Sequence, residues 1–86
     1  MLVHPPAELD PSTEADFEAS LLAADPTGTT TVDFSGVTFC DSTGLRVLVA
    51  YQRRHAEAGG KLQVRGASPS IRRVFEITGL DDLLAE

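Results

Sequence analysis

The sequence predicts one small α/β domain, in which helices pack on a mostly parallel central sheet of about three to four strands. Segments rich in β-branched residues alternate with segments of helical periodicity, which is typical of strand–helix–strand units. Of the 86 residues, 42% are hydrophobic, which suffices for a single core. No internal repeat, low-complexity tract or linker divides the chain, so residues 1–86 form one predicted domain with its body at residues 10–84.

The acidic composition and the lack of long apolar runs limit the classes of function. The net charge of −6 would repel phosphate backbones, which argues against a nucleic-acid partner and favours a basic protein partner. No run approaches the roughly 20 apolar residues that span a bilayer, and residues 1–6 lack the features of a signal peptide. We therefore expect a cytoplasmic protein that does not insert directly into a membrane.

The N-terminal third is expected to hold a brief edge strand and one helix. Leu2 and Val3 can pair as an edge strand before two prolines end it. Residues 10–14, Asp-Pro-Ser-Thr-Glu, combine a capping side chain, an early proline and an acid, as helix starts do. Apolar residues then recur at helical spacing and predict a helix over about residues 11–24; they are Phe17, Leu21 and Leu22.

The central segment predicts a buried strand followed by a long amphipathic helix. Residues 29–34 have the β-branched content of a strand, and after a polar turn residues 42–58 form the helix, which a glycine pair ends. The apolar stripe of this helix is Leu45, Leu48, Val49 and Ala56, and its solvated face includes Arg46, Arg53, Arg54 and Glu57. A charged His55 would favour the helix dipole, and neither His55 nor His4 has a second metal ligand at suitable spacing.

The C-terminal part is expected to add one strand and one more helix. Residues 61–65 alternate between polar and apolar side chains, which predicts a half-exposed strand. Residues 69–77 read as a third helix, capped by the serine before it and ended by Gly79. Residues 81–84 are expected to start one last turn.

The turn before the long helix holds the candidate functional residues Asp41, Ser42 and Thr43. Their oxygens can accept hydrogen bonds from the unpaired N–H groups of the first helical turn, so in one interpretation they only cap the helix. In the other, Ser42 is a hydroxyl that another protein modifies or recognises, and the helix N-terminus would favour an added phosphate. Gly44 would let the turn approach the strand behind it. Cys40, the only cysteine, excludes an internal disulfide and is expected to be a small buried side chain.

Four segments carry a resemblance to a known family. Residues 39–45, Phe-Cys-Asp-Ser-Thr-Gly-Leu, followed by a hydrophobic helix, resemble the signature turn of STAS-domain proteins, in particular the anti-sigma factor antagonists of bacteria. Residues 7–10 with Thr13, residues 59–64, and residues 68–75 with the turn at 78–80 resemble further parts of the family in the same order. The resemblance therefore extends over most of the chain and implies a single STAS-like domain.

The resemblance implies a binding module that is switched by phosphorylation and is not an enzyme. Ser42, which directly follows Asp41, would be phosphorylated by an anti-sigma factor with serine kinase activity, and a PP2C-type phosphatase would reverse the modification. The partner kinase would bind the Mg-ATP, so this chain would need no cofactor and no metal. Unmodified, the chain would bind the anti-sigma factor and release a sigma factor, which regulates transcription. The implied partner-binding residues are Asp10, Asp33, Asp41, Ser42, Thr43 and Gly44.

Three points stay open in the sequence. Asp33 either lies near the partner-binding face, as the resemblance implies, or is a strand-end residue satisfied by nearby backbone N–H groups. STAS domains usually open with a strand pair or a long strand, so residues 1–9 form a shortened N-terminal segment, and one bare sheet edge would offer a route to a homodimer. Short STAS proteins also serve as non-switched subunits of membrane-lipid transport complexes of the ABC type, where they dock on the ATPase.

Overall fold

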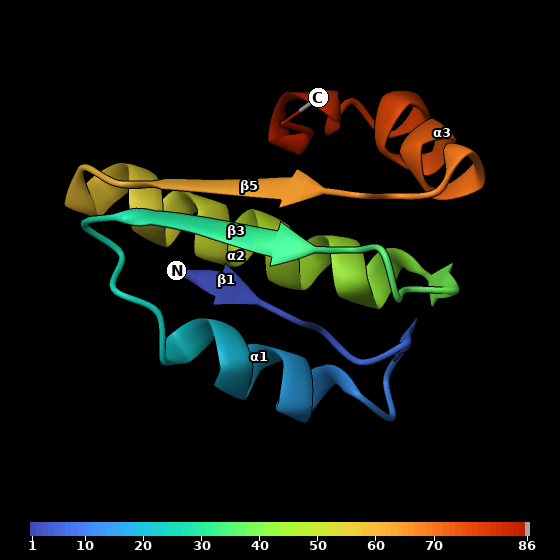
Figure 1. Cartoon of the computed structure of the whole chain (residues 1–86), viewed down its shortest axis with the longest axis horizontal. Helices are drawn as coiled ribbons and strands as arrows, with labels where there is room; N and C mark the ends of the chain where they lie inside the picture. Colours follow the sequence, from blue (N-terminus) through green and yellow to red (C-terminus); the bar gives the residue numbers. More distant parts are fainter. Residues whose placement is uncertain (86) are drawn as a thin grey trace.

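The computed structural model describes residues 1–85 and shows a small parallel sheet, a separate two-stranded ribbon and three α-helices (Figure 1). In chain order the elements are β1 (Leu2–Val3), β2 (Glu8–Leu9), α1 (Glu14–Leu22), β3 (Thr29–Asp33), β4 (Phe39–Cys40), α2 (Ser42–Ala58), β5 (Lys61–Arg65), α3 (Pro69–Ile77) and the 3-10 helix η1 (Asp81–Leu83). The predicted α/β class and the parallel arrangement of the strands are confirmed.

The main sheet has the order β1-β3-β5, and both of its strand pairs are parallel. Val32 at its centre lies opposite Val3 on one side and Val64 on the other. The predicted edge strand at the N-terminus is therefore confirmed, although it is only two residues long. The remaining strands, β2 and β4, pair with each other in parallel and place Leu9 opposite Cys40. This short ribbon leads directly into α2.

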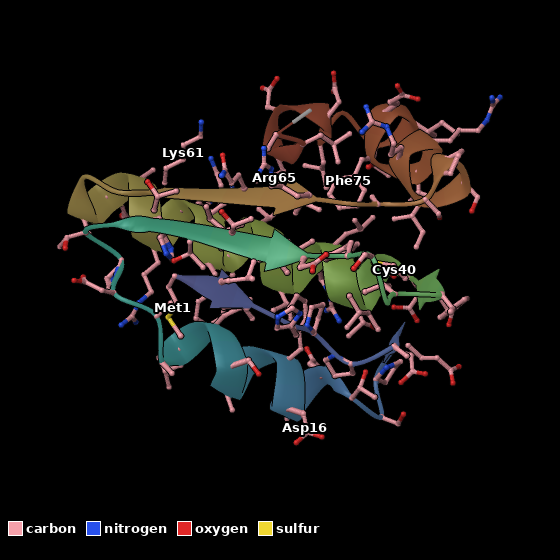
Figure 2. All side chains as sticks on the ribbon, viewed as in Figure 1. Met1, Asp16, Cys40, Lys61, Arg65 and Phe75 are labelled. Carbon is pink, nitrogen blue, oxygen red and sulfur yellow. The ribbon has the colours of Figure 1, made fainter. Side chains whose placement is uncertain are left out.

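One face of the sheet packs on α2, which runs behind the strands in Figure 1, while α1 and α3 lie to either side. Alternate residues of the three strands are buried on that face; they are Val3, Thr30, Val32, Leu62 and Val64. Phe75 of α3, which is labelled in Figure 2, extends the core. Its ring packs edge-on against that of Phe34, with ring centroids 5.9 Å apart. Apolar burial of this kind is the main favourable term in the stability of so small a domain.

The first helix is shorter than the sequence predicts. It runs over Glu14–Leu22 instead of about 11–24, because the residues before it form a turn. The Asp10 carboxylate accepts hydrogen bonds from the Ser12 N–H at 2.9 Å and from the Ser12 hydroxyl at 2.6 Å. The Thr13 hydroxyl donates to the Glu8 carbonyl at 2.6 Å and does not cap the helix. These local side-chain bonds hold the backbone outside the helical conformation.

The second helix has the predicted bounds, but its inner face differs from the predicted stripe. Ala56 is exposed, Val49 is half-buried, and His55 is fully buried in their place. The His55 Nδ1 lies 2.8 Å from the Tyr51 carbonyl and its Nε2 lies 2.7 Å from the Thr30 hydroxyl. His55, which the sequence associates only with the helix dipole, is therefore a buried residue: its Nε2 joins α2 to β3, while its Nδ1 contacts a carbonyl of α2 itself.

The C-terminal elements agree with the prediction. Strand β5 has the alternating burial of a half-exposed strand, and α3 covers the predicted residues with the Ser68 hydroxyl accepting from the Ile71 N–H at 3.4 Å. Gly79 adopts a left-handed φ of 74° just after the helix, as expected of a residue that ends it. The expected last turn is the 3-10 helix η1, after which the Ala85 N–H donates to the Val64 carbonyl at 2.9 Å and covers part of the β5 edge.

Candidate functional site

The candidate site is the junction where β4 ends and α2 begins. Asp41 is the N-cap residue of α2: its backbone is extended and its carboxylate accepts from the Thr43 N–H at 2.8 Å. The capping interpretation thus applies to Asp41. Its own N–H donates to the Leu9 carbonyl at 3.1 Å, which fixes the turn against the β2–β4 ribbon. The N-cap residue Asp41 is therefore held by a bond to α2 on one side and a bond to β2 on the other.

Ser42 and Thr43 present their hydroxyl groups to opposite environments. Ser42 is exposed, and within residues 1–85 its hydroxyl makes no hydrogen bond. Thr43 is only 5% exposed and lines a narrow crevice between α2 and α1, together with Asp10 and Phe17. Successive residues of a helix point about 100° apart, so a helix that packs on one side of its first turn hides one hydroxyl and exposes the other. A partner can therefore reach Ser42.

Gly44 lets α2 approach the ribbon closely. A Cβ on this residue would lie 2.8 Å from the Cys40 Sγ and 2.9 Å from the Leu9 Cβ, distances that real Cβ atoms do not show. Gly44 therefore lets the start of the helix approach the strand behind it, as the sequence predicts.

Cys40 is half-buried, whereas a buried side chain was expected. Burial, with a smaller effect of the Asp41 charge, raises the pKa of its thiol to about 11.

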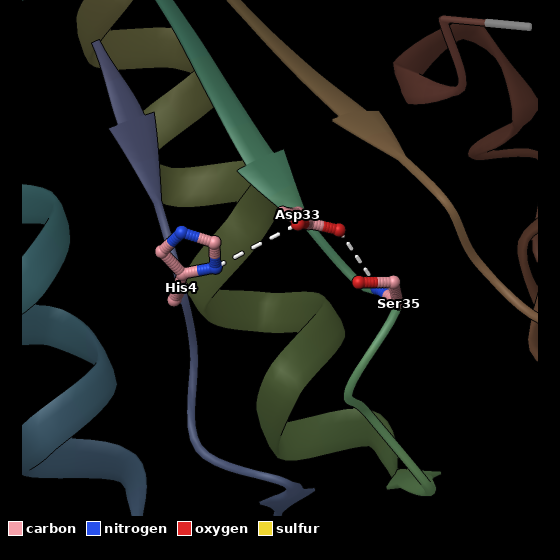
Figure 3. A network of polar contacts seen from close by, with 3 residues as sticks. All are labelled: His4, Asp33 and Ser35. Carbon is pink, nitrogen blue, oxygen red and sulfur yellow. Dashed lines mark hydrogen bonds and ion pairs between the residues drawn. The ribbon is translucent and has the colours of Figure 1, made fainter.

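Asp10 lies beside the start of α2, and Asp33 is the last residue of β3. Asp10 borders the crevice that Thr43 and Gly44 line, and its hydrogen bonds, the Ser12 hydroxyl above all, lower the pKa of its carboxyl. Asp33, at the end of β3, accepts from the Ser35 N–H at 2.9 Å and lies 3.6 Å from His4 (Figure 3). The bond from Ser35, with a smaller effect of His4, lowers the pKa of Asp33. The structure thus places Asp10 beside Thr43 and Gly44 and makes Asp41 the N-cap that precedes Ser42, while Asp33 accepts a backbone N–H at a strand end, as in its second interpretation.

A recess on the outer face of α2 was not predicted. It has a volume of about 820 Å³ and begins at Ser42. Glu14 and Glu18 of α1 line one side of it, and Thr78 and Leu80 line the other. Because of its arginines, this face of α2 was expected to be exposed to solvent. The signal that could have revealed the recess is the presence of Val49 and Ala50 between those arginines.

The described residues offer neither a metal site nor a membrane-spanning helix. Among residues 1–85, no group of three or more His, Cys, Asp or Glu side chains is arranged to hold a metal ion. In the same part of the chain, every helix is too short or too polar to cross a bilayer.

Comparisons with known proteins give consistent matches. The family model described as "Mlab, STAS domain" matches residues 6–85. The anti-sigma-B factor antagonist of Staphylococcus aureus (strain NCTC 8325 / PS 47) is 37% identical over 79 residues, which cover 90% of this chain and 73% of the relative. The protein of the same name from Staphylococcus epidermidis is 35% identical with the same coverage.

Solved structures share the fold. The anti-sigma factor antagonist SpoIIAA in its unphosphorylated form matches with a TM-score of 0.70 at 25% identity, over 96% of this chain and 75% of that one. The phosphorylated form of SpoIIAA, a Bacillus cell fate determinant, matches with a TM-score of 0.68 at 25% identity. The match covers 96% of this chain and 78% of that one. An anti-sigma-factor antagonist (STAS) domain protein from Planctomyces limnophilus has a TM-score of 0.77 at 22% identity. The match covers 91% of this chain and 70% of that one, and at this identity it supports the fold alone. With the family model and the Staphylococcus relatives, these matches show that the chain belongs to the STAS domain family.

Proposed function

We propose that this chain is an anti-sigma factor antagonist whose binding is switched by phosphorylation of Ser42. The observation that carries the proposal is the exposed Ser42 hydroxyl, which has no partner within residues 1–85 and stands at the first residue of a capped helix. Two kinds of comparison support it. The Staphylococcus relatives are named as anti-sigma-B factor antagonists, and SpoIIAA, which has this fold, exists in unphosphorylated and phosphorylated forms.

The proposed partners are an anti-sigma factor with serine kinase activity and a PP2C-type phosphatase. The kinase transfers a phosphoryl group from its own Mg-ATP to the Ser42 oxygen, and the phosphatase removes it by hydrolysis. In the unmodified state the chain binds the anti-sigma factor, which then releases its sigma factor. This chain acts as substrate and ligand in both reactions, so it needs no metal or cofactor of its own.

The proposed switch works through local charge and bulk. A phosphate adds about −1.5 to −2 charges at pH 7, beside the Asp41 carboxylate. The helix N-terminus lowers the cost of that charge within the domain, because its N–H groups and dipole favour an anion. An interface fitted around a neutral hydroxyl would instead meet extra volume, desolvation and repulsion from like charges. Because the exposed Ser42 hydroxyl makes no hydrogen bond within residues 1–85, the modification ends binding without unfolding the domain.

We also propose that the chain is a binding module and not an enzyme. A nucleophilic serine needs a neighbouring base that accepts its proton, and the Ser42 hydroxyl has no hydrogen-bond partner in the described part of the chain. Cys40 is a second potential nucleophile. Its raised pKa of about 11 keeps the thiol protonated, and therefore unreactive, at neutral pH.

Two substitutions at position 42 test the proposal by titration calorimetry with the serine-kinase anti-sigma factor of the same genome. Ser42→Ala is expected to bind as tightly as the unmodified chain, because the position stays neutral and small. Ser42→Asp is expected to bind at least about tenfold more weakly, since like charge in an interface costs on the order of 1.4 kcal/mol or more. Equal affinity of the two variants would contradict the switch. Failure of every variant to bind the anti-sigma factor, with stable association to a transporter ATPase, would instead favour the non-switched transport subunit.

A further inference from the structure

We propose that the outer face of α2 is a docking strip for an acidic, amphipathic helix of the anti-sigma factor. The proposal rests on the proposed function, since it names the part of that partner which meets this chain and the chemistry of the contact. It departs from the expectation drawn from net charge, which favours a basic partner. The strip is defined here as Ser42, Arg46, Val49 and Arg53.

The geometry of α2 brings these four side chains into one line. They are spaced at i, i+4, i+7 and i+11, which is the spacing of residues on one face of an α-helix. With a rise of 1.5 Å per residue the line is about 16 Å long, or three helical turns. Ser42, the proposed site of phosphorylation, stands at one end of the strip and Arg53 at the other.

The strip lies within the recess and is bordered by apolar side chains. Leu45 and Ala50 of α2 and Leu80 beyond α3 line the same recess of about 820 Å³. Val49 lies between Arg46 and Arg53 on the strip and offers the partner an apolar contact. An apolar surface with charges at helical spacing is the pattern that amphipathic helices recognise, since their side chains repeat with the same period. The recess therefore fits a helix better than an extended segment.

The charges of the strip determine the sign of the charge that the partner must present. Arg46 and Arg53 form no ion pair within residues 1–85, although the whole chain carries a net charge of −6. Their separation of seven residues, about 10.5 Å along the axis, matches two carboxylates at the same spacing on a facing helix. Glu14 and Glu18 of α1 line one side of the recess and would repel acids placed there, so they confine an acidic face to the arginine line.

The strip also explains how a phosphate at one end of α2 can block binding along its length. Ser42 precedes Arg46 by four residues, and side chains at this spacing are neighbours on a helix. A phosphate on Ser42 would pair with Arg46 and withdraw it from the partner. Its remaining negative charge would repel the acidic face of the docking helix. The modification and the docking surface thus belong to one mechanism.

Charge reversal at Arg53 tests the strip, because this residue is eleven positions away from Ser42. We expect Arg53→Glu to weaken binding of the unphosphorylated chain to the anti-sigma factor by about tenfold, and Arg53→Gln to weaken it less. The affinity of the unsubstituted chain should fall as salt is raised, and this dependence should be smaller for Arg53→Gln. The matched control is Arg73→Glu, an exposed position on α3 outside the recess, which should bind within about twofold of the unsubstituted chain.

The outcomes separate this proposal from the proposed function. Equal affinities for Arg53→Glu and the unsubstituted chain, or equal losses for Arg53→Glu and Arg73→Glu, would overturn the strip and leave the switch at Ser42 standing. An anti-sigma factor that does not bind the unsubstituted chain would overturn both. Circular dichroism of each variant checks that the helices are retained. Methyl resonances of Val49 and Leu80 should shift in the complex, and unchanged resonances would also overturn the strip.

Discussion

Ser42 and Thr43 carry the same hydroxyl group on adjacent residues, and the packing of α1 against α2 makes only Ser42 available to a partner. The sequence places both at the start of a helix but cannot say which of them faces the neighbouring helix. The resemblance to the STAS family selected Ser42 because it directly follows the aspartate. The structure adds an independent physical reason for choosing Ser42, since the Thr43 side chain is buried, with only 5% of its surface exposed.

Gly44 provides a test of the packing at the site. Replacement by alanine should lower the free energy of unfolding by about 1–3 kcal/mol, because its Cβ would overlap Cys40 and Leu9. Urea denaturation measures the loss. Gly36→Ala is the matched control, since a Cβ there would meet no atom within 4 Å, and its effect should stay within about 0.5 kcal/mol. In a Cys40→Ala background the cost of Gly44→Ala should shrink; an unchanged cost would show that the contact with Cys40 does not limit the approach of α2.

At the scale of elements, the hydrogen bond between β3 and α2 positions the helix that carries the site. The Tyr51 carbonyl can only accept, so His55 Nδ1 donates to it and, in the neutral ring, Nε2 accepts from the Thr30 hydroxyl. Thr30 and His55 are both buried. An imidazole nitrogen left unpaired in such a place loses its hydration without compensation.

Thr30→Val removes the hydroxyl while keeping the shape of the side chain. We expect it to lower the free energy of unfolding by about 1–3 kcal/mol, since it leaves Nε2 buried and unsatisfied. Thr29→Val, at the exposed first residue of the same strand, is the control and should change stability little. Thermal and urea unfolding of the two variants measure the difference. If they are equally stable, the His55 hydrogen bond does not hold α2 on the sheet.

The helices also show which sequence signals determine their bounds. Helix α2 could be predicted to the residue, because Asp41 caps its start and Gly59, with a φ of 89°, ends it. The start of α1 could not, because the Asp10 side chain bonds to Ser12 in a turn that has the same residue types as a helix cap. Ala56 was misplaced for a different reason. As an apolar residue it was assigned to the buried stripe of the helix. The hydrogen bond between His55 and Thr30 instead places His55 on the inner face and leaves Ala56 exposed.

At the scale of the whole molecule, the alternation of strands and helices was sufficient to predict the class of fold. It could not show that β2 and β4 form their own ribbon, because two-residue strands leave almost no periodic signal. The recess on α2 was also beyond the sequence, since it lies between two helices and the turn after α3, which meet only in the folded chain. The homodimer predicted through a bare sheet edge stays a prediction, with β1 as the two-residue edge strand at which to test it.

The proposed switch is one phosphate on Ser42, and intact mass spectrometry tests it most directly. The unsubstituted chain would be incubated with Mg-ATP and the serine-kinase anti-sigma factor, and the site would be mapped by fragmentation. We predict a single added phosphate on Ser42, removed by a PP2C-type phosphatase and absent from Ser42→Ala. An unmodified chain, or a phosphate on any other residue, would contradict the central claim.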